Sequence, residues 1–183
     1  MPFRVHLHPY RRLTDSGKND VKIGILSDTH LSAVNEAFAR QVAACFAGTG
    51  MILHAGDLTD PAVLQVFAGK EVHAVHGNMC SLAACRNLPT RKEIRVGAFT
   101  IGLIHNLGHG YDFEERLLEV FPTADCIVYG HTHIPVCRRV GRVLYINSGS
   151  FTGTGRHGGP GTYAILEAGE TLRASIHQIR NPF

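Results

Sequence analysis

Short apolar runs alternate with polar loops along the first half of the chain. Val21–Leu26 is rich in β-branched residues, and residues 34–46 follow it with apolar positions at helical spacing. Met51–His54 and residues 72–75 are further apolar runs, and a capping residue and a proline introduce a helix over residues 62–67. This alternation of strand and helix predicts a parallel sheet in this part of the fold.

The second half has a different pattern, in which apolar runs come in pairs joined by short turns. Three hairpins are predicted: residues 93–96 with Phe99–Ile104, residues 134–140 with 143–146, and residues 163–166 with 172–179. A helix over residues 112–120 and a strand at Cys126–Tyr129 lie between the first two hairpins. The whole pattern predicts an α/β protein with a mixed, β-rich core and helices outside it.

Composition fits one globular domain. The chain has 183 residues, of which 44% are hydrophobic, and this is enough for a sizeable core and too much for a disordered chain. Residues 1–20 show no clear periodicity, so we interpret them as an N-terminal extension and residues 21–183 as the domain. No apolar stretch approaches the roughly 20 residues that span a bilayer, so we expect no membrane contact. The five cysteines form no CxxC pair, which fits a reducing cytoplasm.

Metal-binding side chains stand at the ends of the predicted strands, where the loops of an α/β sheet form a crevice. Together they offer two carboxylates, one amide and four imidazoles: Asp28, His30, Asp57, Asn78, His105, His131 and His133. Oxygen ligands mixed with imidazoles suit manganese, iron, zinc or nickel, whereas an all-oxygen cage suits magnesium or calcium. The pattern therefore favours a transition-metal site.

The number of these ligands indicates two ions. Seven ligands exceed the needs of one ion with open positions, and they divide over two ions if one carboxylate bridges. Two divalent ions roughly 3.5–4 Å apart hold a hydroxide and clamp the oxygens of an in-line phosphoryl displacement. We therefore expect a metal-dependent phosphoesterase, and we assign no catalytic group beyond that hydroxide.

The motifs Asp-x-His, Gly-Asp, Gly-Asn, His and Gly-His-Thr-His stand in this order, and residues 144–150 read Leu-Tyr-Ile-Asn-Ser-Gly-Ser. This arrangement resembles the calcineurin-like metallophosphoesterase superfamily, and above all its small bacterial and archaeal phosphodiesterases, which are relatives of the retromer subunit Vps29. The resemblance covers residues 21–179 and implies an αββα fold, a two-sheet mixed β sandwich flanked by helices. It implies two manganese ions, with nickel, iron, zinc and magnesium as alternatives. A small phosphate ester is the implied substrate, and the diester class is favoured.

The resemblance also divides the ligands between the ions. It implies that Asp57 bridges, that one ion is completed by Asp28, His30 and His133, and that the other is completed by Asn78, His105 and His131. Two departures from the family pattern concern the leaving group and the turn after His105. Met79 and Cys80 stand where many members have a histidine acid and an acidic orienter. Asn106 stands where the family often has glycine, and it either touches substrate or closes a turn.

Two other functions stay open at this level. The main alternative is a metal-containing protein-binding scaffold like Vps29 with little catalytic activity. A weaker one is a nucleic acid bound by Arg4, Arg11, Arg12 and Lys18. The net charge of +3 is small and scattered, so it does not demand nucleic acid as a partner, although nucleic acid is retained as a candidate substrate. A homo-oligomer is compatible with the sequence.

The remaining candidates have plainer interpretations. His54 ends an apolar strand three residues before Asp57 and is either a support for the ligands or, as we favour, a hydrogen-bonded core histidine. Residues 153–161 form a glycine-rich loop that either cradles phosphate or connects two elements. The other histidines are expected to be structural or on the surface: His73, His76, His109, His157 and His177.

Overall fold

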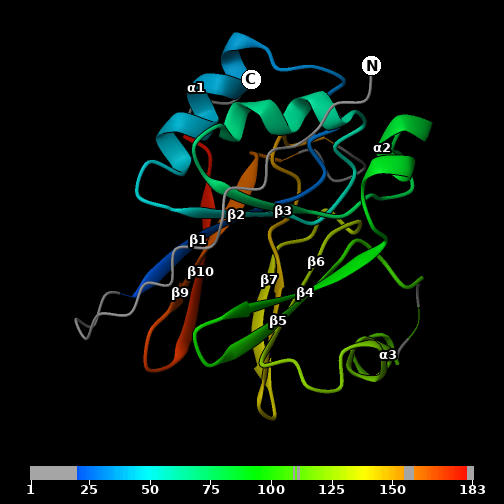
Figure 1. Ribbon diagram of the computed structural model, residues 1–183, viewed down its shortest axis with the longest axis vertical. Coiled ribbons are helices and arrows are strands. Elements are labelled where there is room, and N and C mark those ends of the chain that lie inside the picture. The colour runs from blue at the N-terminus through cyan, green and yellow to red at the C-terminus, as the bar shows by residue number, and fades with distance from the viewer. Residues whose placement is uncertain (1–19, 109, 111, 155–158, 181–183) are drawn as a thin grey trace.

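The computed structural model describes residues 20–108, 110, 112–154 and 159–180 and has four layers. Two β-sheets pack face to face, with helices over the outer face of each (Figure 1). This confirms the predicted αββα sandwich. Apart from Asp20, the expected extension over residues 1–20 lies outside the described residues, so its separation from the domain stays a prediction.

The first sheet has the order β10-β9-β1-β2-β3. Its centre is the predicted parallel unit of β1 (Val21–Leu26), β2 (Met51–His54) and β3 (Glu71–Ala74). The last hairpin of the chain, β9 (Thr162–Ala168) and β10 (Leu172–Gln178), joins this unit by antiparallel pairing of β9 with β1. The sheet is therefore mixed, because residues far apart in sequence pair beside β1.

The second sheet has the order β4-β5-β6-β8-β7. Its parallel centre, formed by β5 (Phe99–Ile104), β6 (Cys126–Tyr129) and β8 (Val143–Asn147), is flanked by antiparallel β4 (Arg91–Val96) and β7 (Val136–Val140). The hairpins β4–β5 and β7–β8 follow the sequence prediction, although β4 starts two residues earlier and β7 two residues later than expected.

Four helical segments cover the sheets: α1 (Glu36–Cys45), η1 (Pro61–Phe67), α2 (Leu82–Asn87) and α3 (Phe113–Val120). The first begins later than predicted because the Asn35 side chain accepts the Phe38 N–H and caps it there. The segment η1 is a 3₁₀ helix, and α2, capped by Ser81, is a helix that the sequence pattern did not predict. None of the helices described is long and apolar enough to cross a membrane.

Three apolar clusters hold the layers together. The largest lies between the sheets and contains Ile25, Leu53, Leu103 and Val128, which are all buried. Aromatic residues of α1 and η1 form the second cluster on the outer face of the first sheet, and α3 packs against the second sheet in the third. Because β1 runs parallel to β2 and β5 runs parallel to β6, the carboxyl ends of each pair lie at the same edge of their sheet.

Candidate metal centre

The loops that follow the parallel strands of both sheets are tied together by backbone hydrogen bonds. Within the first sheet, Asp28 N–H donates to the Gly56 carbonyl at 3.0 Å and His30 N–H to the Asp57 carbonyl at 2.9 Å. Between the sheets, His131 N–H donates to Asp28 Oδ2 at 3.0 Å. These bonds bring residues more than 100 positions apart in sequence to one place.

The predicted ligands adopt an unusual backbone conformation. Among the described non-glycine residues, six have positive φ, and one of them is Thr59. The other five, with φ between 50° and 72°, are all predicted ligands: Asp28, His30, Asp57, His131 and His133. Left-handed backbone costs an L-residue roughly 1 kcal/mol or more, and such residues cluster at functional sites. The surrounding hydrogen bonds therefore hold this edge in a conformation that aims the side chains inward.

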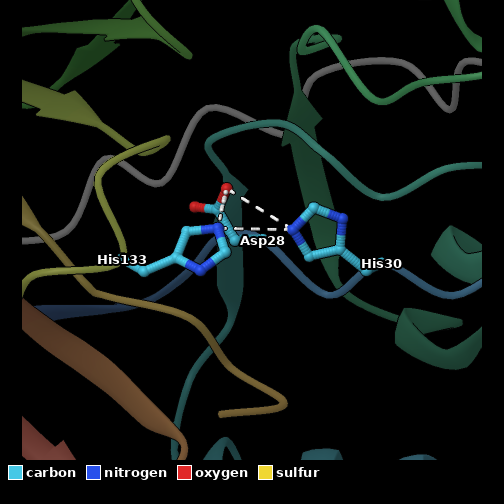
Figure 2. A group of neighbouring side chains, drawn as sticks. All are labelled: Asp28, His30 and His133. Atoms are coloured by element: carbon cyan, nitrogen blue, oxygen red, sulfur yellow. Dashed lines mark hydrogen bonds and ion pairs between the residues drawn. The ribbon is translucent and has the colours of Figure 1, made fainter. Parts of the chain in front are cut away.

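The first group of side chains consists of Asp28, His30 and His133 (Figure 2). In this view the two imidazoles lie to the left and right of the carboxylate, and both turn a ring nitrogen toward it. His133 Nε2 lies 3.1 Å and His30 Nε2 3.9 Å from Asp28 Oδ1, and the two nitrogens are 3.3 Å apart. Three potential ligand atoms thus converge on one point.

The second group consists of Asp28, Asp57 and His105, and Asn78 adjoins it. His105 Nε2 lies 3.3 Å from Asp57 Oδ2 and 3.2 Å from Asn78 Oδ1. Asp28 is common to both groups, whereas the family resemblance implies Asp57 as the bridge; that bridging role stays a prediction.

The hydrogen-bond pattern shows that these atoms fit a cation. The Nδ1–H of His105 donates to the Ala55 carbonyl and that of His133 to the Thr154 carbonyl, both at 2.7 Å. In these neutral tautomers each Nε2 carries a lone pair instead of a proton. Each lone pair then faces carboxylate or amide oxygens that also lack protons. Such converging acceptors repel one another unless a proton or a metal ion lies between them.

The carboxylates have the same property. Asp28 Oδ2 accepts hydrogen bonds from Ser27 Oγ and from the His131 N–H, but the buried Oδ1 accepts none within the described part of the chain. Asp57 Oδ1 accepts the Met79 N–H at 2.7 Å, which leaves Oδ2 toward His105. In each carboxylate, one oxygen is fixed by N–H or O–H donors while the other faces the imidazoles. A buried acceptor without a donor is costly, and a bound cation would satisfy it.

The pKa shifts have the direction expected where carboxylates favour positive charge. Asp28 is the main factor that raises the pKa of His133, because its Oδ1 would accept a hydrogen bond from a protonated Nε2. Burial lowers the pKa of His105, but the hydrogen bond and charge of Asp57 and the charge of Asp28 outweigh it, so the pKa is raised overall. Burial raises the pKa of Asp57, yet its hydrogen bond and charge interaction with His105 bring it below its ordinary value. The attraction that binds a proton here also binds a metal ion.

Close packing of the loops explains two glycines. A Cβ at Gly77 would lie 2.2 Å from Asp57 Oδ1, and a Cβ at Gly56, whose φ is +95°, would lie 2.6 Å from His105 Nδ1. Any larger residue at either position would displace a predicted ligand. His131 belongs to neither group of converging atoms but adjoins the second. Its ring is 5.4 Å from the His105 ring, centroid to centroid, and its backbone N–H donates to Asp28 Oδ2.

Residues behind the ligands also shape the site. His54 is fully buried; its Nδ1 accepts the Gly56 N–H at 3.3 Å and its Nε2 lies 3.2 Å from Thr29 Oγ1. It joins the loops after β1 and β2, and burial lowers its pKa to about 4, so it stays neutral near pH 7. His54 is therefore the hydrogen-bonded core histidine that we favoured, although its partners adjoin two ligands.

Ser150 and the Thr154 carbonyl provide support that the sequence did not single out. Ser150 Oγ donates to the Asp28 carbonyl at 2.9 Å, and the Thr154 carbonyl orients His133. The sequence signal for Ser150 was its place in the Leu-Tyr-Ile-Asn-Ser-Gly-Ser segment, whereas a backbone carbonyl leaves no signal in the sequence.

The two departures from the family pattern have local structural roles. Cys80 Sγ accepts the Gly77 N–H at 3.2 Å and packs against the apolar cluster below η1. The Met79 side chain is exposed. Asn106 Oδ1 accepts the Gly108 N–H at 2.9 Å. Of the two roles expected for Asn106, substrate contact or closing a turn, this contact corresponds to closing a turn. None of these side chains replaces the missing histidine acid.

Three further histidines within the described ranges lie outside the two ligand groups. His73 pairs with Glu71 at the edge strand β3, His76 contacts Cys85, and His177 stacks on Tyr163. His109 and His157 lie outside the described residues, as do residues 155–158 of the glycine-rich loop. The phosphate-cradle interpretation of that loop therefore stays a prediction.

Comparison with known proteins gives a consistent result. A probable metallophosphoesterase of Methanothermobacter thermautotrophicus is 32% identical over 157 residues, covering 84% of this chain and 90% of the relative. The phosphodiesterase YfcE of Escherichia coli is 36% identical over 61 residues, a third of each chain. The structure of vacuolar protein sorting 29 from Cryptosporidium parvum matches with a TM-score of 0.73 at 17% identity, covering 90% of this chain and 94% of that one, and this likeness concerns the fold alone.

The family model closes the argument. Residues 21–171, which include all seven predicted ligands, match the model described as the calcineurin-like phosphoesterase superfamily domain. The resemblance inferred from the spaced motifs is therefore confirmed, and the chain belongs to the calcineurin-like phosphoesterase superfamily.

Proposed function

We propose that this protein is a phosphodiesterase that hydrolyses small phosphate esters with two divalent ions, manganese in the first place. The observation that carries the proposal is the convergence of acceptor atoms on two adjoining points that share Asp28. The donor set of carboxylate, amide and imidazole is the one that manganese, iron, zinc and nickel accept. When bound, a pair of such ions activates water and neutralises the charge of a phosphoryl group.

The residues of this chain prepare that chemistry. Asp28, His30 and His133 would hold one ion, and Asp57, Asn78 and His105 the other, with His131 beside the second group. The Ala55 and Thr154 carbonyls keep Nδ1–H of His105 and His133 in place, so each Nε2 faces the centre without rotation. Five ligands held in left-handed backbone cannot relax away from one another, which limits reorganisation when charge develops.

The diester class is proposed because a relative in the comparisons is named a phosphodiesterase. A non-catalytic scaffold is the second candidate, and one observation favours it. Met79 and Leu82, near the start of α2, are large apolar side chains with 59% and 65% of their surface exposed. Exposed apolar residues of this kind mark some protein interfaces.

Metal removal separates the two candidates. Protein stripped with a chelator should not hydrolyse bis(p-nitrophenyl) phosphate, and added Mn²⁺ should restore turnover with two ions bound per chain. His133→Ala should lower kcat/KM by ~10²-fold or more, because it removes a ligand beside the substrate. His177→Ala, an exposed histidine on β10, is the matched control and should stay within about twofold of the native protein. Full activity in metal-free protein, or none in the Mn²⁺-loaded protein, would contradict the proposal.

A further inference from the structure

Three hydroxyl side chains stand at alternate positions after β8: Ser150, Thr152 and Thr154. Ser150 Oγ donates to the Asp28 carbonyl at 2.9 Å. Thr152 Oγ1 shares its single proton between two carbonyls, that of Asp28 at 3.4 Å and that of Thr29 at 3.2 Å. Both hydroxyls therefore reach across more than 120 positions of sequence to hold the peptide groups that follow Asp28.

These two peptide groups set the direction of His30. They lie between Asp28 and His30, whose φ angles are 54° and 50°. The peptide group of the Thr29 carbonyl also carries the His30 N–H, which donates to the Asp57 carbonyl at 2.9 Å. It is thus held at both ends, and loss of the Thr152 hydroxyl would release one of them. Left-handed backbone of this kind persists only where its surroundings hold it.

Thr154 connects the same network to His133. Its carbonyl accepts the His133 Nδ1–H at 2.7 Å. Its N–H donates to Ser150 Oγ at 3.2 Å, and its hydroxyl lies 3.2 Å from Ser150 Oγ and 3.3 Å from Thr152 Oγ1. Because Ser150 and Thr152 give their own protons to carbonyls, the Thr154 hydroxyl is the donor toward them. The network therefore joins the partner of the His133 ring to the peptide groups that precede His30.

The other ligands are oriented from elsewhere. Donors in the loops after β1 and β6 fix one oxygen of the Asp28 carboxylate. In the second group, the Ala55 carbonyl orients His105 and the Met79 N–H orients Asp57. The hydroxyl network therefore acts on the two imidazoles that belong to the first group alone.

We infer that Ser150, Thr152 and Thr154 are positioning residues, whose hydroxyls set the affinity of the first group for its ion without touching that ion. The inference rests on the proposed function, because it takes the first group to hold an ion of its own. It adds that the two ions are tuned separately, one through side-chain hydroxyls and the other through backbone atoms. Groups that orient a metal ligand from behind typically contribute roughly 10–100-fold to metal affinity.

Titration calorimetry of the full chain with Mn²⁺ tests this without turnover. Thr152→Val keeps the shape of the side chain and removes its hydroxyl, so one ion should bind ~10-fold more weakly while the other stays within about twofold. Thr152→Ser keeps the hydroxyl and should restore the native affinity. Thr154→Val should have a smaller effect on the same ion, because its carbonyl still orients His133. The segment should keep its fold in each variant, since the Phe151 N–H still donates to the Ser27 carbonyl at 3.0 Å.

Two further variants assign the effect to one ion and to one place. His30→Ala should leave only the ion of the second group, and adding Thr152→Val to it should change the remaining dissociation constant by less than about twofold. Thr49→Val is the matched control, because Thr49 Oγ1 also donates to a backbone carbonyl, that of Phe46 at 3.0 Å, but stands before β2 instead of after it. Urea unfolding should show a similar loss of stability for Thr49→Val and Thr152→Val, whereas Thr49→Val should bind both ions as the native protein does.

The outcomes separate this inference from the proposed function. Selective weakening by Thr152→Val with rescue by Thr152→Ser supports the inference, and if the native protein then hydrolyses no phosphodiester, only the proposed function fails. Unchanged affinities, or equal weakening of both ions, overturn the inference while hydrolysis of bis(p-nitrophenyl) phosphate leaves the proposed function intact. Weakening of the ion that remains in His30→Ala also overturns the inference. Native protein that binds one ion or none overturns both.

Discussion

The two ligand groups share Asp28 but differ in their access to solvent. We call the second group closed, because the side chains of Asp57 and His105 are only 2% and 4% exposed. We call the first group open, because the side chains of His30 and His133 are 23% and 18% exposed. The orienting carbonyls differ in the same way, because Ala55 directly follows β2 in the core, whereas Thr154 stands in an exposed loop.

This difference indicates a division of work within one centre. A buried, rigid group binds an ion firmly because its ligands lose little freedom on binding, whereas an open group leaves positions for water and substrate. The closed group is therefore the part that should hold its ion most firmly and support the fold. Under the proposed function, the open group is the part at which an ester would arrive. Four measurements test this division.

The largest effect is expected from the carboxylate that the family resemblance names as the bridge. Asp57→Ala should lose both ions and lower kcat/KM by at least ~10³-fold, since several kcal/mol of charge stabilisation disappear. His30→Ala should lose only the ion of the open group. Elemental analysis after Mn²⁺ saturation measures both. Retention of two ions by Asp57→Ala would exclude the bridging role and favour Asp28, which the geometry places in both groups.

The second effect concerns the leaving group, since Met79, whose N–H donates to Asp57 of the closed group, and its neighbour Cys80 stand where many family members have an acid and its orienter. Neither the Met79 thioether nor the Cys80 thiol is a good donor to an alkoxide at neutral pH, and a positioned general acid typically contributes 10²–10⁴-fold. We expect kcat/KM to fall by ~10²-fold or more from aryl to alkyl esters. Met79→His with Cys80→Asp should speed the alkyl esters selectively. A flat dependence, with the chemical step rate-limiting, would mean that another group supplies the proton.

The third effect is the pH dependence of metal affinity. The pKa values of His105 and His133 are raised in the metal-free protein, so both rings bind protons more firmly than free imidazole does. For each proton that the metal ion must displace, the apparent metal affinity falls about tenfold for every pH unit below the raised pKa. Competition with a chelator from pH 8 to pH 5.5 measures the slope. His133→Ala should reduce it by one proton, and an unchanged slope would contradict the assignment.

The pKa shifts also determine how the stability of the metal-free fold depends on pH. A raised pKa in the folded state means that protonated His133 stabilises the fold fully below its unfolded pKa, near 6.5, and that this stabilisation is lost as the pH rises through the raised value. Asp57 has the opposite dependence. Its ionised form stabilises the fold fully above its unfolded pKa of 3.8, and this stabilisation is lost as the pH falls through the lowered pKa.

The smallest expected effect is on the stability of the fold, which should depend more on the closed group than on the open group. In chelated protein, His105→Ala leaves a cavity and removes the Nδ1–H donor of the Ala55 carbonyl, so the free energy of unfolding should fall by about 1–3 kcal/mol. His133→Ala, which removes a partly exposed ring, should cost less than about 1 kcal/mol. Urea unfolding monitored by circular dichroism measures both. Equal costs would remove the distinction between a closed and an open group.

The sequence predicts most strands and all the ligand loops, because apolar runs and the polar residues at their ends are local signals. The pairing of β9 with β1 and the position of Ser150 against Asp28 depend on contacts more than 120 residues apart, which no local pattern carries. The short helix α2 escaped prediction because six residues give too little periodicity. Several groups that orient the ligands are backbone atoms, among them the His131 N–H and the Ala55 and Thr154 carbonyls, so residue types do not reveal them.

The left-handed backbone at the ligands implies a tension between activity and robustness. Glycine adopts this conformation freely, so replacing a ligand such as His30 with glycine would relieve strain while deleting chemistry. A lineage released from selection for turnover would gain backbone stability only where glycine replaced a ligand in left-handed conformation. Loss of function at these positions is therefore a downhill step in backbone energy, and continued selection for turnover would oppose it.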